Sequence, residues 1–106
     1  MEKKRPHYPL AVVQRIVADP ELRVFTATAL DGGLAMGLLE AEMRAVVCGL
    51  TTGQFYKSMT TQRDHRVWQD VYHAMTPVGI EAYIKITAYG DVRPPVIQFK
   101  RKDDER

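Results

Sequence analysis

The chain has 106 residues, of which 45% are apolar and 26% charged, and its formal net charge is +2. This length predicts a single domain spanning residues 1–106, with no room for a second independent core. No apolar stretch approaches the roughly 20 residues that a membrane-spanning helix needs, and no signal-peptide pattern follows the basic residues 3–5. We therefore expect a cytoplasmic globular protein with no membrane association.

Helical periodicity dominates the first half of the chain. Apolar residues recur at intervals of three and four before Asp19 and Pro20, and again before Gly49, which is expected to close the last helix. A short helix is expected between these two, and Gly32 and Gly33 are expected to break it. The expected elements are helices over 9–18, 26–30 and 39–48, and a β-like piece over 22–25.

After Phe55 the periodicity changes to two, which predicts strands. Within 79–89, alternate positions from Ile80 to Ala88 are apolar, and Tyr83 and Lys85 lie on the other face. Helices followed by strands indicate an α+β fold, in which helices pack on one face of an antiparallel sheet and the other face shows polar residues to solvent. The expected strands cover 55–61, 67–72, 79–89 and 96–100, with turns at 63–65 and 90–95.

Several classes of reactive site are not supported by the sequence. The three histidines have no metal-ligand spacing, and there is no CxxC, HExxH or Walker pattern. Ser58, the only serine, is not in a nucleophile-elbow motif. The single cysteine, Cys48, follows three apolar residues, so we expect a small buried side chain rather than a catalytic thiol.

The charge and the residue types of the chain are compatible with a protein that binds or cleaves nucleic acid. Residues 54–102 hold eight basic and four acidic side chains, which favours a polyanionic partner, although a mixed solvated surface explains this equally well. RNA carries its own nucleophile, the 2′-hydroxyl. A protein that moves protons and stabilises phosphoryl charge with lysine and tyrosine can therefore cleave it. From the residues alone, the sequence predicts only a possible nucleic-acid-binding α+β domain.

A shared pattern is formed by the segments 55–61, 64–65, 68–72, 83–87, 90–92 and 99–100, together with the start of the chain. Over nearly its whole length the chain thereby resembles the MqsR family of mRNA-interferase toxins. The likeness is dense from 55 to 100, thin from about 20 to 48, and includes the start of the chain. It implies a RelE-type fold with a curved sheet, and ribosome-independent cleavage of mRNA at a short GC-containing sequence without a cofactor. It also implies an antitoxin partner that contains zinc and binds DNA, as MqsA does.

The resemblance places the family's proposed catalytic residues at Lys57, Gln69, Tyr83 and Lys100. We expect Lys57 and Tyr83, as proton-transfer candidates, to be exposed. Alternation puts Gln69 on the face of its strand that looks buried, so it either supports the site from the core or lies at a bulge. Trp68 and Tyr72 are expected in the core, with base stacking as the alternative. Further candidates for phosphate contact are Lys85, His65 and Arg66.

The chain departs from the family pattern after Tyr72. It reads His73-Ala74 where a known member of the family has Arg-Pro, so one basic phosphate contact is expected to be lost. Two other functions remain open: a non-catalytic nucleic-acid-binding regulator that uses the same basic sheet face, and an inactive toxin relic that keeps only its antitoxin-binding surface.

Overall fold

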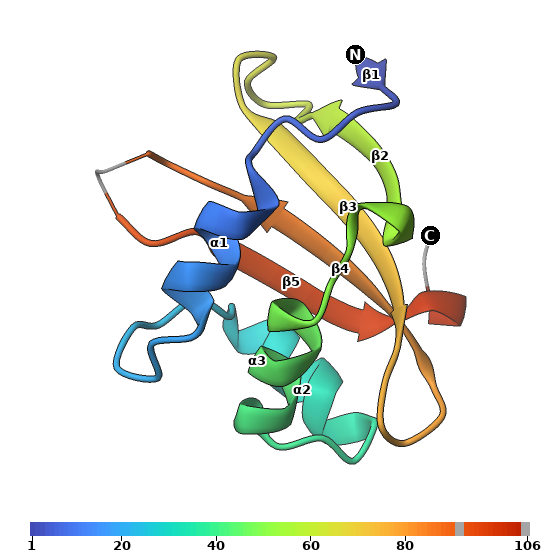
Figure 1. Ribbon diagram of the computed structural model, residues 1–106. Coiled ribbons are helices and arrows are strands. Elements are labelled where there is room, and N and C mark those ends of the chain that lie inside the picture. Colours follow the sequence, from blue (N-terminus) through green and yellow to red (C-terminus); the bar gives the residue numbers. More distant parts are fainter. Residues whose placement is uncertain (91–92, 105–106) are drawn as a thin grey trace.

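The computed structural model describes residues 1–90 and 93–104, and in this part of the chain helices cover one face of a five-stranded antiparallel sheet (Figure 1). The strands follow one another in chain order. Helices on one face of an antiparallel sheet confirm the expected α+β class. Asp91 and Val92, part of the matching segment 90–92, lie outside the described residues. The helices are α1 Leu10–Val17, α2 Ala27–Ala35 and α3 Glu40–Cys48, with 3₁₀ turns η1 Thr52–Gln54 and η2 Lys102–Asp104. The strands are β1 Glu2–Lys3, β2 Phe55–Thr60, β3 Trp68–Met75, β4 Glu81–Thr87 and β5 Val96–Arg101.

The hydrophobic core lies between the helices and one face of the sheet. Val17 and Val47 from the helices pack there with Ile84 and Phe99 from the strands, and all four are at most 1% exposed. Tyr72 belongs to this core, where burial and the nearby Asp70 raise the pKa of its hydroxyl to about 12. Core packing, not base stacking, is therefore its role. Within the described residues, no helix is long and apolar enough to cross a membrane.

Helix α2 runs through Gly32 and Gly33, so the expectation that these glycines break it was wrong. The Thr26 hydroxyl caps its start by accepting the Ala29 N–H at 3.0 Å. A Cβ atom on Gly32 would lie 2.5 Å from the Phe99 carbonyl oxygen, and one on Gly33 would collide with the Met43 side chain. The glycines let α2 lie close to β5 and α3, and this packing outweighs their low helix propensity.

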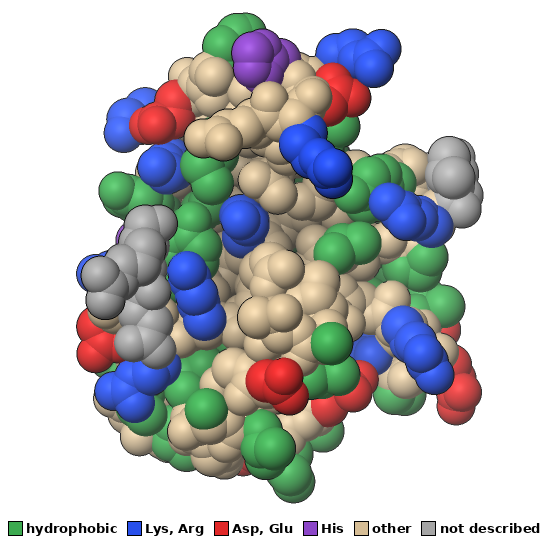
Figure 2. Space-filling view, turned by 180° about the vertical axis from the view of Figure 1, so that it is seen from behind, with side chains coloured by type: hydrophobic (Ala, Val, Ile, Leu, Met, Phe, Trp, Pro, Cys, Tyr) green, Lys and Arg blue, Asp and Glu red, His purple; other side chains and the backbone are tan. Residues whose placement is uncertain are grey.

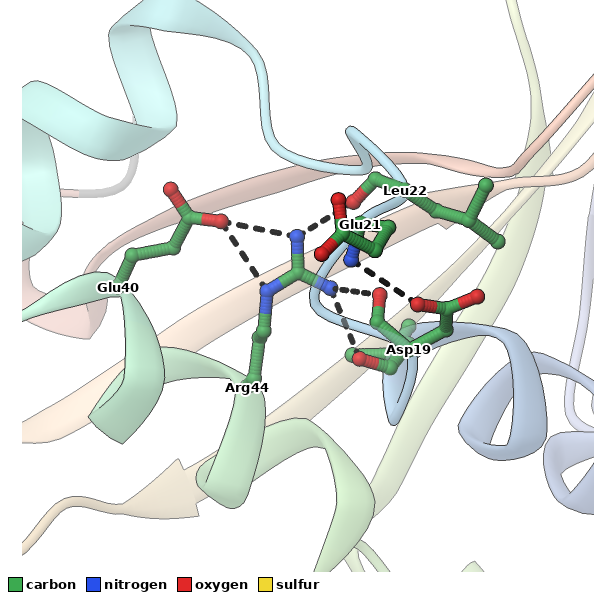
Figure 3. Close-up of polar contacts among 6 residues, drawn as sticks. Asp19, Glu21, Leu22, Glu40 and Arg44 are labelled. Carbon is green, nitrogen blue, oxygen red and sulfur yellow. Dashed lines mark hydrogen bonds and ion pairs between the residues drawn. The ribbon is translucent and has the colours of Figure 1, made fainter.

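The loop between α1 and α2 is held by a buried arginine rather than by the strand expected at 22–25. Only Phe25 makes a bridge to Ile97 in β5. The Arg44 guanidinium, on α3, donates to the carbonyls of Val17 at 2.9 Å and Asp19 at 3.0 Å, and to that of Leu22 (Figure 3). It also pairs with the Glu40 carboxylate at 2.8 Å, so its charge is compensated although the residue is only 7% exposed.

Cys48, at the end of α3, is exposed, so the expectation that this side chain is buried was wrong. Gly49 caps the helix as expected, but with φ −91°, so it does not use the left-handed conformation of many glycine caps. The Gln14 side chain of α1 donates to the last two helix carbonyls, with its Nε2 3.2 Å from the Val47 oxygen and 3.1 Å from the Cys48 oxygen, and it also lies 2.8 Å from the Leu50 oxygen beyond the helix. An apolar run therefore ends in an exposed thiol because the helix turns that position outward.

An N-terminal segment missed by sequence periodicity completes the sheet. Strand β1 pairs with β2, with Lys3 opposite Ser58. The buried Asp70 carboxylate accepts the His7 N–H at 2.9 Å, the Tyr8 N–H at 2.8 Å and the Ser58 hydroxyl at 2.6 Å. The segment also covers Trp68, since the His7 ring stacks on it at 5.3 Å and the Lys3 ammonium lies 4.2 Å from its ring centroid. One carboxylate thus ties the start of the chain to the middle of the sheet.

Candidate active site

The helix-free face of the sheet brings together all four residues that the resemblance marks as catalytic. Strand register sets Lys57, Val71, Lys85 and Gln98 side by side in one row across the sheet. The next row holds His73, Tyr83 and Lys100. Figure 2 looks at the molecule from behind, and shows Lys and Arg side chains across the middle of the face with acidic side chains towards its margins.

Lys85 has a central position in this arrangement. It lies directly opposite Val71 and Gln98 and is diagonal to Lys100. Burial, and then the charge of Lys100, lower the pKa of the Lys85 ammonium. Val71 is fully buried even though the helices lie on the other face. A half-buried lysine beside a second positive charge favours binding of an anion, which would compensate its charge.

The expectation that Lys57 and Tyr83 are exposed was wrong for Tyr83 and only partly right for Lys57. Tyr83 is 6% exposed, with the His73 ring 5.7 Å from its own and the Lys100 ammonium 5.2 Å from its centroid. The Lys57 side chain is 21% exposed, and its ammonium lies 3.7 Å from a Glu2 carboxylate oxygen. Long side chains from adjacent strands cover these positions, which alternation along one strand cannot show.

Gln69 lies on this same face, half-buried, with its Nε2 atom 3.2 Å from the Thr87 hydroxyl. The alternation that grouped it with Val71 was correct, but the face was not the helix-covered core. The bulge considered for its strand occurs in β2 instead, between Phe55 and Lys57. Gln69 belongs to the site because it lies on the helix-free face of β3, together with Val71 and His73. Buried residues occur on both faces of this strand, so the sequence pattern alone does not show which face packs against the helices.

The structure separates two phosphate-contact candidates from this cluster. His65 and Arg66 are exposed in the turn between β2 and β3, beyond the strand ends. Arg66 pairs with Asp64 at 3.0 Å, and this hydrogen bond lowers the pKa of the Asp64 carboxyl. His65 and Arg66 therefore lie at the margin of the site, whereas Lys85 is at its centre.

His73 is a site residue that the sequence reasoning missed. It was considered only as the loss of a basic contact, yet it lies opposite Tyr83 and stacks on the Tyr56 ring at a centroid distance of 4.4 Å. Its position could have been found by continuing the alternation from Gln69 and Val71 along the strand. Within residues 1–90 and 93–104, no group of three His, Cys, Asp or Glu side chains is placed to hold a metal ion.

Comparison with known proteins agrees with this geometry. Residues 5–101 match the family described as motility quorum-sensing regulator, toxin of MqsA. The chain belongs to this family. It is also 41% identical over 102 residues to the mRNA interferase toxin MqsR of Escherichia coli (strain K12), covering 96% of this chain and 100% of the relative. The resemblance drawn from the motifs is confirmed, and the α+β architecture is compatible with the RelE-like fold expected for an MqsR toxin.

Proposed function

We propose that this MqsR-family protein is a toxin that cleaves mRNA as an endoribonuclease, without ribosomes or a metal cofactor, at a short GC-containing sequence. The observation that carries the proposal is the convergence of Lys57, Gln69, Tyr83, Lys85 and Lys100 on one face. These residues come from four adjacent strands, so chance surface composition is a poor explanation for their meeting. The family's activity supports a catalytic role over a non-catalytic regulator.

The reaction is a phosphoryl transfer within the RNA, from the 5′-oxygen to the 2′-oxygen. The 2′-oxygen attacks the adjacent phosphorus, the bond to the 5′-oxygen breaks, and a 2′,3′-cyclic phosphate forms. One proton leaves the 2′-hydroxyl and one reaches the departing 5′-oxygen, so the protein needs a proton acceptor and a proton donor. We assign these two tasks to Lys57 and Tyr83.

Two further lysines supply charge for the same step. Negative charge builds on the non-bridging phosphoryl oxygens as the 2′-oxygen attacks. Lys85 and Lys100 are diagonal neighbours, so both ammonium groups can contact one phosphate. Burial and the charge of Lys100 lower the pKa of Lys85, so keeping its ammonium charged costs free energy. A phosphate bound there removes this cost by compensating the charge, and it is also attracted to the ammonium. Gln69, held by Thr87, positions the RNA from the adjacent row.

In a buffer with excess EDTA and no ribosomes, the purified protein is expected to cleave single-stranded RNA into fragments with 2′,3′-cyclic phosphate (or 3′-phosphate) and 5′-hydroxyl ends. A matched substrate with one 2′-deoxy residue at the cleavage position should resist cutting, because its nucleophile is missing. End-group analysis by mass spectrometry checks both results. Activity that requires a divalent ion, or cutting of the deoxy substrate, would contradict the mechanism. Binding without any cutting would favour the regulator.

We also propose a protein partner, a zinc-containing, DNA-binding antitoxin of the MqsA type, and action in the cytoplasm. The matched family is described as a toxin of MqsA, which supports such a partner. Expression of the chain alone should stop bacterial growth, and co-expression of its antitoxin should restore it. The Lys57→Ala variant should be harmless in the same growth assay. If the folded wild-type protein is also harmless at high level, the toxin assignment fails.

A further inference from the structure

A β-bulge turns one aromatic residue onto the helix-free face beside the lysines. Phe55 is paired with Tyr72, and Lys57 with Val71, so Tyr56 is the extra residue between two normal pairs. Bulges of this kind re-aim side chains and are enriched next to active sites. Here the result is a stack: the Tyr56 ring lies on the His73 imidazole with centroids 4.4 Å apart and an interplanar angle of 26°.

The stacked pair adjoins the proposed site on two sides. His73 is directly opposite Tyr83, which is in turn opposite Lys100. On the other side, the Lys57 ammonium lies 5.4 Å from the Tyr56 ring centroid. A phosphate held by these lysines would therefore have an aromatic ring within reach of the nucleoside attached to it.

Tyr56 is also unusually open for an aromatic residue in this fold. It is 45% exposed, whereas Tyr72 in β3 and Tyr83 in β4 are 1% and 6% exposed. A ring supported by an imidazole and open to solvent has the form of the stacking platforms that bind unpaired bases.

We propose that Tyr56, supported by His73, binds a nucleobase of single-stranded RNA adjacent to the scissile phosphate. This rests on the proposed ribonuclease function and assigns its base-binding subsite. The lysines hold the phosphate, and the stacked base fixes the rotation of the nucleotide, which helps to align the 2′-oxygen with the phosphorus. His73 acts as a positioning residue because it holds the tyrosine ring.

The test uses an RNA that cannot be cut, so binding is measured independently of catalysis. It contains a GC step with 2′-deoxy sugars at both positions and 2-aminopurine on one side of the step or the other. Stacking quenches 2-aminopurine fluorescence. We expect wild type and Tyr56→Phe to quench the probe in at least one position. We expect Tyr56→Leu, which keeps bulk but loses the aromatic ring, to abolish that quenching and weaken affinity by about 10-fold.

The matched control is Tyr89→Leu, since Tyr89 is another partly exposed tyrosine but lies in the loop after β4, against Arg93. It should bind and quench as wild type does. His73→Ala should fall between wild type and Tyr56→Leu in quenching, with thermal melts confirming that each variant is folded. Unchanged quenching and affinity in folded Tyr56→Leu, or an equal loss in Tyr89→Leu, would overturn the proposal. Failure of the ribonuclease function is seen separately, as no cleavage of the all-ribose RNA by wild type.

Discussion

Lys57→Ala is expected to lower the single-turnover rate of RNA cleavage by roughly 10²–10⁴-fold, the usual loss when a proton-transfer or charge-stabilising group is removed. Its melting temperature should change little. The 3.7 Å contact between Lys57 and Glu2 joins two partly exposed side chains, and such pairs contribute little to stability. Rapid-quench cleavage assays and thermal melts on the same preparation measure the two effects. Arg66→Ala, which removes an exposed cation from the hairpin turn, is the control and should retain most activity.

The companion variant for the second proton-transfer group is Tyr83→Phe, not Tyr83→Ala. Because Tyr83 is 6% exposed, truncation to Ala would remove a buried ring and destabilise the fold by about 3–5 kcal/mol, the range for large-to-small aromatic substitutions. The Phe variant keeps the ring under Lys100 and removes only the hydroxyl. If Lys57→Ala and Tyr83→Phe both cleave at near-wild-type rates while folded, neither residue transfers a proton, and the assignment of the site is wrong.

Asp70→Ala is expected to cause a large loss of stability, although Asp70 is not one of the residues of the hydrophobic core. The Asp70 carboxylate is 1% exposed and accepts three hydrogen bonds, from the His7 and Tyr8 amides and from the Ser58 hydroxyl. Its removal leaves those donors without a partner and releases the N-terminal segment from the sheet. With roughly 1–3 kcal/mol for each donor left without a partner, we expect a decrease of about 3–5 kcal/mol in the free energy of unfolding and a melting temperature lower by more than about 10 °C.

Urea denaturation with far-UV circular dichroism measures this loss, and Asp64→Ala is the control. Asp64 is a carboxylate in the exposed hairpin turn, so its replacement should have a much smaller effect. A change below about 1 kcal/mol for Asp70→Ala would show that the three hydrogen bonds are replaced by water, and that the N-terminal segment is not anchored by this residue.

Local patterns in the sequence determined the order and type of most elements. Helical spacing located α1 and α3, and strict alternation located β4, because these periodicities repeat the geometry of the backbone within a few residues. The motifs around Lys57 and Gln69 were sufficient to indicate the family. Together with the segments that hold Tyr83 and Lys100, the resemblance also named the four residues that the sheet register brings to one face, although their catalytic roles remain predictions.

Tertiary structure decided what depends on neighbours distant in the sequence. Only packing against Phe99 and Met43 explains why α2 continues through two glycines. A strand as short as β1 has no periodicity to detect, and it exists because Asp70 holds the segment that follows it. Tyr83 is buried by side chains from adjacent strands. The alternation along a strand shows which residues share a face, but the burial of that face is set by what the rest of the chain places over it.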